Sequence, residues 1–336
     1  MKISNINLDE KVMIVAEIGN CHEGDFSLAE KLISLAADSG ADAVKFQTII
    51  PEKLVSSDQK NRIKQLKRFQ LSYDDYKNLS IIAKEHNVLF LSTPFDIESV
   101  YFLDKIVPAF KIASSDNNFY PLLKTIAMTG KPVIMSTGLS DVEDIIKSKK
   151  YIENVWTKSN ITQEMILLHC VSAYPTPPKY ANLLAINDLK KIGSKIGYSD
   201  HTLGIDAAIL SVALGARLIE KHFTISKDYS NFRDHQLAAD PDEFSQLVKK
   251  VRLAECLLGN NLKKIQDCEQ NAVIEARRSI AANKQLNKGH IITYDDLTWV
   301  RPGYGIAPGR ENEIINKKLT KSISMGEPIL FDDISE

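Results

Sequence analysis

Polar residues stand in or at the ends of several short, β-branched apolar runs of the sequence. In three of these runs two polar residues are separated by one position, so both would project from the same face of a strand. The three pairs are Lys45 and Gln47, Ser199 and His201, and Glu220 and His222. Glu17 and Lys111 occupy comparable positions in two further runs. Because an unpaired buried charge is strongly destabilising, we interpret the group as a functional site. The alternative is a set of internal salt bridges.

Two of these residues are histidines that close consecutive runs. His201 and His222 would end neighbouring strands, and adjacent strands lie about 4.8 Å apart. Two imidazoles at matched height could bind one metal ion and leave open positions for a substrate. From spacing alone, each histidine could equally be a hydrogen-bonded core residue.

The lysines and a group of hydroxyls indicate a site for an anion. Lys45 and Lys111 could neutralise a bound dianion, and hydroxyls at strand ends and helix N-termini commonly bind phosphate. The hydroxyls in question belong to Thr93, Ser114, Ser136 and Thr137. Taken singly, each could be an ordinary helix N-cap. A buried lysine of lowered pKa could instead form a Schiff base, as in class I aldolases.

The elements that must position these residues alternate between strand and helix up to about residue 258. Segments with apolar residues at three- and four-residue spacing separate eight apolar runs, which predicts a strand–helix repeat. The runs are residues 12–19, 43–48, 88–94, 109–114, 132–138, 165–171, 195–201 and 217–223. Eight such units over about 250 residues match an α/β fold of the (β/α)8 TIM-barrel type, whose sites form at the C-terminal ends of the strands.

A doubly wound sheet would also alternate strands and helices. No Gly-x-Gly-x-x-Gly follows the first run, however, which disfavours the dinucleotide-binding version of that fold. The longest connection, at about residues 49–72, is rich in Lys, Gln and Arg and is expected to be a partly helical insertion at the mouth of the barrel.

The pattern changes after the last barrel helix. We expect a catalytic barrel at 1–258, a linker at 259–277 and a small, mostly β domain at 278–336, where short β-rich runs follow polar turns with glycine.

Composition excludes several classes of function. The 42 Lys and Arg nearly balance the 43 Asp and Glu, so no net field attracts nucleic acid or an anionic membrane. The four cysteines lack metal or disulfide spacing, and no apolar run suggests a signal peptide or a membrane span. We therefore expect a cytoplasmic protein with free thiols.

Ordered motifs along nearly the whole chain resemble the sialic acid synthase family, which includes N-acetylneuraminate, legionaminic acid and pseudaminic acid synthases. The motifs are AEIGNCHEG, GADAVKFQT, FLSTPFD, AFKIASSDNNFYPLL, STGLS, LLHCVSAYPTP, IGYSDHT and IEKHFT. The segment RRSIAANKQLNKGHIITYDDLTWVRPGYGI resembles the C-terminal antifreeze-like (SAF, β-clip) domain of that family.

The resemblance implies a transferase that condenses phosphoenolpyruvate with an open-chain N-acylated hexosamine and releases phosphate. It implies a divalent metal, with Mn²⁺ preferred and Mg²⁺ or Co²⁺ as alternatives, and a domain-exchanged homodimer. The expected metal ligands are His201 and His222, and the catalytic set adds the carboxylates Glu17 and Asp116. The residues expected to bind phosphoenolpyruvate are Lys45, Thr93, Lys111, Ser114, Ser172 and Ser199. The residues expected on the sugar side are Gln47, Tyr174, Asp234 and Arg301, the last from the neighbouring subunit.

The chain departs from the family pattern mainly on the sugar side. Ser114-Ser115-Asp116 stands where Ser-Gly-Glu is frequent, Ser172 where Asn is frequent, and Phe232-Arg233-Asp234 where Gly-Pro-Asp is frequent. Reaction type is therefore better specified than acceptor. We expect N-acetylmannosamine as acceptor. The alternatives are its 6-phosphate, a 2,4-diacetamido hexose leading to legionaminic or pseudaminic acid, a class I Schiff-base aldolase, and a non-catalytic sugar-binding barrel.

Overall fold

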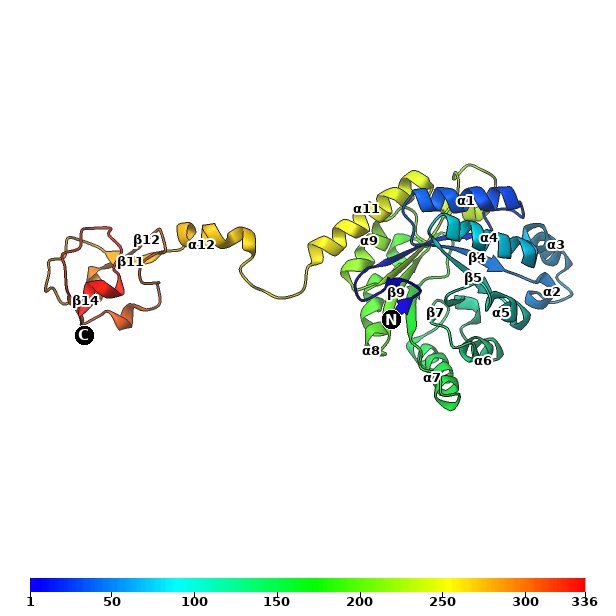
Figure 1. Cartoon of the computed structure of the whole chain (residues 1–336), viewed down its shortest axis with the longest axis horizontal. Coiled ribbons are helices and arrows are strands. Elements are labelled where there is room, and N and C mark those ends of the chain that lie inside the picture. Colours follow the sequence, from blue (N-terminus) through cyan, green and yellow to red (C-terminus); the bar gives the residue numbers. More distant parts are fainter. Residues whose placement is uncertain (336) are drawn as a thin grey trace. The chain divides into compact units, whose positions relative to one another are not determined.

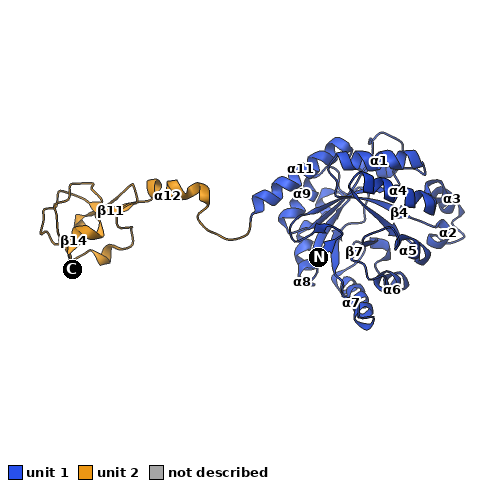
Figure 2. Ribbon diagram, in the orientation of Figure 1, with its two compact units in different colours: residues 1–259 blue, residues 260–336 orange. Residues whose placement is uncertain are grey.

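A computed structural model describes residues 1–335 of the chain. The chain divides into two compact units, residues 1–259 and 260–336, coloured separately in Figure 2. Each unit has its own hydrophobic core.

The first unit is built on one sheet of eight parallel strands. They are β3 (Met13–Gly19), β4 (Ala43–Thr48), β5 (Leu89–Pro94), β6 (Phe110–Ile112), β7 (Val133–Ser136), β8 (Met165–Cys170), β9 (Lys195–Asp200) and β10 (Leu218–His222). Their hydrogen-bonded order is β5-β4-β3-β10-β9-β8-β7-β6, so neighbours in the sheet are neighbours in the sequence, and β10 pairs with β3. The two ends of this order, β5 and β6, are also in contact, which makes a nearly closed barrel. The predicted TIM-barrel class is confirmed.

Helices surround the strands on the outside, as Figure 1 shows. They are α1 (Phe26–Asp38), α2 (Pro51–Leu54), α3 (Lys60–Phe69), α4 (Tyr73–Glu85), α5 (Ile97–Leu103), α6 (Tyr120–Met128), α7 (Val142–Lys158), α8 (Ile186–Lys191), α9 (Asp206–Ala213), α10 (Arg233–Leu237) and α11 (Pro241–Leu258). Their starts follow capping chemistry: Asp25 accepts hydrogen bonds from the first turn of α1, and Ser72 and Asp75 form a capping box on α4. The connection at 49–72 contains α2 and α3, as expected.

The barrel interior changes from apolar to polar along the strands. On β3 the inward positions read Met13, Val15 and Glu17, since alternate residues point the same way. The apolar end is closed by the N-terminal hairpin β1 (Lys2–Ile3) and β2 (Ile6–Asn7), whose Ile3 packs with Met13 and Val15. Polar groups are thereby restricted to the C-terminal ends of the strands.

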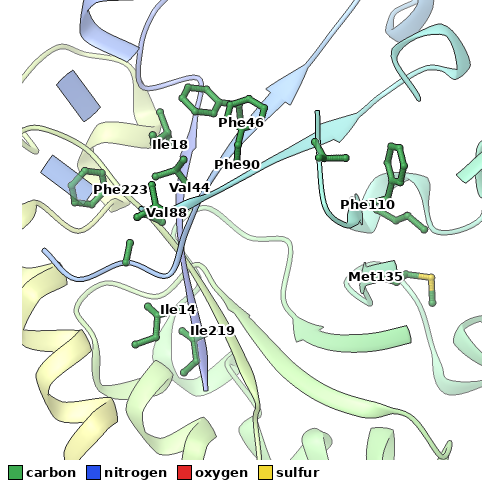
Figure 3. Close-up of a cluster of buried hydrophobic side chains, with 14 of the residues drawn as sticks. Ile14, Ile18, Val44, Phe46, Val88, Phe90, Phe110, Met135, Ile219 and Phe223 are labelled. Atoms are coloured by element: carbon green, nitrogen blue, oxygen red, sulfur yellow. The ribbon is translucent and has the colours of Figure 1, made fainter. Parts of the chain in front are cut away.

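The opposite faces of the strands pack against the helices. Phe46 stacks on Phe90 with ring centroids 5.4 Å apart, and Phe223 meets Phe244 of α11 edge-on at 5.3 Å. Figure 3 shows these outward-facing strand residues, with Ile14, Val44 and Ile219 among those labelled. This continuous apolar layer fixes the direction of each strand and hence the direction of the polar residues at its end.

The second unit consists of α12 (Gln270–Ala276) followed by two short antiparallel pairs. These are β11 (Ser279–Ala282) with β12 (Leu297–Val300), and β13 (Lys318–Leu319) with β14 (Ile334–Ser335). α12 lies within the segment expected as a linker. Asp296 is buried and accepts hydrogen bonds from His290 and Thr293, and it pairs with Lys284 at 2.8 Å. Burial raises the pKa of Asp296, but these partners outweigh it and hold the pKa well below its usual range.

No helix among residues 1–335 is long and apolar enough to span a membrane.

Candidate active site

A pocket of about 1030 Å³ opens at the C-terminal ends of the barrel strands. Every strand of the barrel contributes at least one lining residue. The strand residues are Glu17, Lys45, Gln47, Thr93, Lys111, Ser136, Cys170, Ser199, Glu220 and His222. This is the position at which active sites form in barrels of this kind.

Four charged side chains form the floor of the pocket. Lys45 Nζ lies 2.6 Å from Glu17 Oε2 and 3.6 Å from Glu220 Oε2, and Lys111 Nζ lies 3.8 Å from Glu220 Oε1. All four are nearly inaccessible to solvent. Their mutual pairing offsets the cost of removing these charges from water.

The pKa values of the charged side chains in the floor are shifted in different directions. Burial raises the pKa of Glu17 despite the nearby Lys45, whereas Lys111 and Lys45 together lower that of Glu220 against the effect of burial. Burial also lowers the pKa of Lys111. Glu17 is therefore the carboxylate that takes up a proton more readily than a free glutamate.

Hydroxyl groups surround the two lysines. Thr93 Oγ1 accepts from Lys45 Nζ at 3.2 Å, and Ser136 Oγ accepts from Lys111 Nζ at 2.7 Å. Ser199 Oγ donates to Glu220 at 2.9 Å. With the charged floor beside them, these groups form a polar cavity suited to a small anion.

A second group of hydroxyls crowds Gly138, just after β7. The Gly138 N–H donates to Ser114 Oγ at 3.0 Å, and a Cβ at position 138 would lie 2.8 Å from Ser114 Oγ and 2.5 Å from Ser172 Oγ. Ser172 Oγ is buried and has no hydrogen-bond partner among residues 1–335. The absence of a side chain at Gly138 therefore leaves space for these two hydroxyls, and the Ser172 hydroxyl remains available to form a hydrogen bond with a ligand.

His201 and His222 lie side by side at the ends of neighbouring strands, with ring centroids 5.5 Å apart. His201 Nδ1 lies 2.8 Å from the Val171 carbonyl, to which it donates in the tautomer that leaves Nε2 with a free lone pair. His222 Nδ1 is buried without a partner in the described part of the chain. Burial is the main cause that lowers the pKa of His222 well below its usual value, which favours a neutral imidazole.

These two imidazoles fit a shared metal ion. An ion about 2.1 Å from each ring nitrogen would bring the centroids to within roughly 5–6 Å of each other, which agrees with the observed spacing. Within residues 1–335, no group of three or more His, Cys, Asp and Glu is arranged to hold a metal. A metal here would thus have two protein ligands and several positions left for other molecules.

Aromatic and polar residues occupy the outer side of the pocket. The Tyr174 ring lies 4.2 Å from that of His201, and the Arg233 guanidinium lies over Tyr174 at 4.9 Å. Asp234 Oδ1 is buried without a hydrogen bond among the described residues, with Arg233 Nε 3.5 Å away. Gln47 donates to Glu17 at 2.9 Å. This part of the pocket offers several groups that could bind sugar hydroxyls.

Comparison with known proteins identifies the family. The NeuB family model matches residues 32–263, more than half of the chain, and the SAF domain model matches residues 277–335. The chain belongs to the NeuB family. It is accordingly an enzyme, and the resemblance to sialic acid synthases is confirmed.

Relatives of this NeuB-family protein cover almost its whole length. It is 38% identical to the N,N'-diacetyllegionaminic acid synthase of Campylobacter jejuni, over 95% of this chain and 99% of that protein. It is 35% identical to a pseudaminic acid synthase of the same species, over 99% of each. The N-acetylneuraminic acid synthetase of Leptospira borgpetersenii, solved as a crystal structure in complex with citrate, is 35% identical in sequence to this chain. The two structures superpose with a TM-score of 0.76, over 81% of this chain and 94% of that one.

The pocket collects twelve of the fourteen residues singled out from the sequence. They are Glu17, Lys45, Gln47, Thr93, Lys111, Ser114, Ser172, Tyr174, Ser199, His201, His222 and Asp234. Asp116 does not line it, since it lies in a 3-10 turn (Ser114–Asp116) where its carboxylate accepts from Ser115 Oγ. Arg301 lies in the second unit and is exposed.

Sequence reasoning gave Glu220 no specific role, although it contacts both lysines of the floor. Its position two residues before His222, on the same strand face, was the signal that could have identified it. Asn20, which donates to Gln47 at 3.1 Å, also lines the pocket and was missed. Arg233 lines it too, and the sequence indicated it only as a departure from the family pattern. Asn20 lies in the turn after β3 and Arg233 begins α10, so strand periodicity carries no information about either residue.

Proposed function

We propose that this enzyme is a nonulosonic acid synthase that condenses phosphoenolpyruvate with the open-chain aldehyde of an N-acylated hexosamine. The observation that carries the proposal is the placement of Lys45, Lys111 and the hydroxyls beside His201 and His222 in one pocket. An anion subsite is thereby adjacent to a site able to activate a carbonyl group.

The reaction would balance as follows. C3 of phosphoenolpyruvate forms a bond to the aldehyde carbon as the C2–C3 double bond opens, and water adds its oxygen to C2. One proton of the water ends on the former aldehyde oxygen. The C2–O bond to the phosphoryl group then breaks, and the C2 hydroxyl becomes the keto group as its proton leaves with phosphate. The products are a 2-keto acid and inorganic phosphate. No redox partner is needed.

We assign the anion subsite to phosphoenolpyruvate. Lys45 and Lys111 would neutralise its phosphate and carboxylate, while Thr93, Ser114, Ser172 and Ser199 would donate hydrogen bonds. The unused hydrogen bond of Ser172 supports this assignment, because a buried polar group without a partner costs free energy until a ligand satisfies it. Glu17, with its raised pKa, is the proposed proton carrier. The placement of Asp116 outside the lining supports Glu17 over Asp116 for that role.

His201 and His222 would hold a divalent ion, for which we propose Mn²⁺. When bound, such an ion would supply Lewis-acid polarisation of the acceptor's carbonyl oxygen. The contact of His201 Nδ1 with the Val171 carbonyl, which leaves Nε2 available as a ligand, and the buried, unpartnered Nδ1 of His222 support this assignment.

The acceptor would occupy the outer side of the pocket, in contact with Gln47, Tyr174 and Asp234. Sequence motifs alone favoured N-acetylmannosamine. The identity is 38% to legionaminic acid synthases from two bacteria, against 35% to the Leptospira N-acetylneuraminic acid synthetase and 30% to the human N-acetylneuraminate-9-phosphate synthase, and this order supports a 2,4-diacetamido hexose instead. We therefore propose a diacetamido hexose as the first acceptor to test, followed by N-acetylmannosamine.

We further propose a homodimer in which Arg301 of one subunit reaches the acetamido group bound in the other. The family resemblance of the RPG turn supports this. The domain boundaries at 258 and 278 are proposed from the change of sequence pattern after the last barrel helix. A cytoplasmic location is proposed because the described cysteines are all free thiols.

Phosphate release tests the reaction class. We expect release that requires both phosphoenolpyruvate and the sugar, that stops on chelation and that returns when Mn²⁺ is added. Borohydride treatment with substrate should leave activity intact after dialysis. Covalent trapping on Lys45 or Lys111 would instead establish Schiff-base chemistry and reject the proposal.

A further inference from the structure

A fully buried ion pair lies directly behind the two histidines. Lys221 Nζ is 2.9 Å from Asp200 Oδ2, and both side chains have no solvent exposure. Asp200 is the last residue of β9 and precedes His201, Lys221 precedes His222 in β10, and Asp200 and Lys221 are paired in the register of the neighbouring strands. Because alternate strand residues point to opposite faces, this pair faces the helical layer while the histidines face the pocket.

The pair also fixes the backbone on both sides of His201. Lys221 Nζ donates to the Thr202 carbonyl at 2.5 Å, and Asp200 Oδ1 accepts from the Thr202 N–H and from its hydroxyl, both at 2.8 Å. The Tyr198 hydroxyl donates to the same oxygen at 3.2 Å. One lysine on β10 thus holds the residues before and after His201.

We infer that Asp200 and Lys221 are positioning residues that set the separation and orientation of the His201 and His222 rings. The inference rests on the proposed function, because it concerns the ion that these histidines would hold. Among residues 1–335 neither side chain forms another salt bridge, and the hydrogen bonds of the pair go to residues at the ends of β9 and β10.

The burial of the pair argues for a geometric role. A buried ion pair is weak evidence for stability, since neutral replacements of similar volume are often tolerated, whereas it can specify one arrangement of the backbone. Groups that orient metal ligands from behind typically change metal affinity by about 10- to 100-fold when they are altered. Removing both charges together avoids leaving one of them unpaired.

The test uses the full chain with the double substitution Asp200→Asn and Lys221→Met. The control is Asp42→Asn with Arg252→Met, which removes a partly buried ion pair of 2.7 Å outside the pocket lining, whose members also pair with Lys11 and Glu255. Mn²⁺ affinity is measured without substrates by electron paramagnetic resonance of the free ion, and thermal unfolding is recorded alongside. We expect Mn²⁺ binding to weaken by about 10- to 100-fold in the first variant and by less than about twofold in the control.

Thr202→Val supplies a milder test should the double variant fail to fold. It removes one hydrogen bond to Asp200 but keeps the ion pair, and we expect Mn²⁺ affinity to fall about fivefold. Unchanged Mn²⁺ affinity in Thr202→Val, or in a folded double variant, would overturn the inference.

His201→Ala in the same assay separates this inference from the proposed function. If His201→Ala binds Mn²⁺ as tightly as the parent, the metal assignment itself fails. If His201→Ala loses Mn²⁺ while the Asp200/Lys221 variant does not, the metal assignment stands and only the positioning role is lost.

Discussion

Gly138→Ala is the most selective perturbation of the proposed phosphoenolpyruvate subsite. The glycine does not need a positive φ, so alanine should fit the backbone without strain. Its Cβ, however, would lie 2.5 Å from Ser172 Oγ and 2.8 Å from Ser114 Oγ, closer than real Cβ contacts. The substitution must therefore displace at least one of the two hydroxyls proposed to bind phosphoenolpyruvate.

The magnitude follows from the hydrogen bonds involved. A hydrogen bond to a charged group contributes about 1.5–3 kcal/mol, so losing one weakens phosphoenolpyruvate binding by about 10- to 150-fold. Loss of both would approach the square of that factor. The unfolding temperature should change little, because the shift is confined to a hydroxyl-lined cavity.

The dissociation constant for phosphoenolpyruvate is measured by calorimetry, and the KM for phosphoenolpyruvate is measured at saturating sugar. Ser172→Ala serves as the partner in a double-mutant cycle, because it removes the closer of the two oxygens. We expect Gly138→Ala to cost clearly less in the Ser172→Ala background than in the parent. Phosphoenolpyruvate affinity within twofold of the parent for Gly138→Ala would refute the placement of the phosphate among these hydroxyls.

Three further predictions concern the metal, the acceptor and the second unit. His201→Ala should lower turnover at least about 100-fold with little change in unfolding temperature, and a parent-like rate in metal-free buffer would reject the metal assignment. Arg301→Ala should raise the KM for the acceptor by about 10- to 150-fold and leave phosphoenolpyruvate binding unchanged, and an equal loss for both would contradict its cross-subunit role. Asp296→Asn should destabilise the second unit by about 1–3 kcal/mol at pH 7. Because the folded pKa of Asp296 is depressed, its contribution is present above the unfolded value of about 3.9 and is lost as the pH falls through the folded pKa. The difference in the free energy of unfolding between Asp296→Asn and the parent should therefore shrink below about pH 4. It is measured by urea unfolding, followed by the fluorescence of Trp299 in a Trp156→Phe background. A difference that stays constant with pH would contradict the pairing.

The barrel and most of its pocket follow from simple rules of strand geometry. Lys45 could be placed in the pocket because its parity on β4 is opposite to that of Phe46, which packs against the helices. The pairing of His201 with His222 followed from the adjacency of successive strands in a barrel. Both arguments depend only on the period of a strand and the order of the chain.

Other features depend on local or tertiary detail that periodicity does not encode. The direction of Asp116 is set by a 3-10 turn, and the contact of Glu220 with two lysines depends on side-chain rotamers. Asp200 and Lys221 stand at strand positions that normally carry apolar residues facing the helices, and only the structure reveals that they pair with each other.

The most direct test of the account is the fate of the bridging oxygen of phosphoenolpyruvate. The enzyme is incubated with Mn²⁺, a 2,4-diacetamido hexose or N-acetylmannosamine, and phosphoenolpyruvate labelled with ¹⁸O between C2 and phosphorus, and the products are analysed by mass spectrometry. We predict a nine-carbon 2-keto acid without the label and inorganic phosphate that carries it. Label retained in the acid, or no such acid with either sugar, would show that the enzyme does not catalyse the proposed condensation.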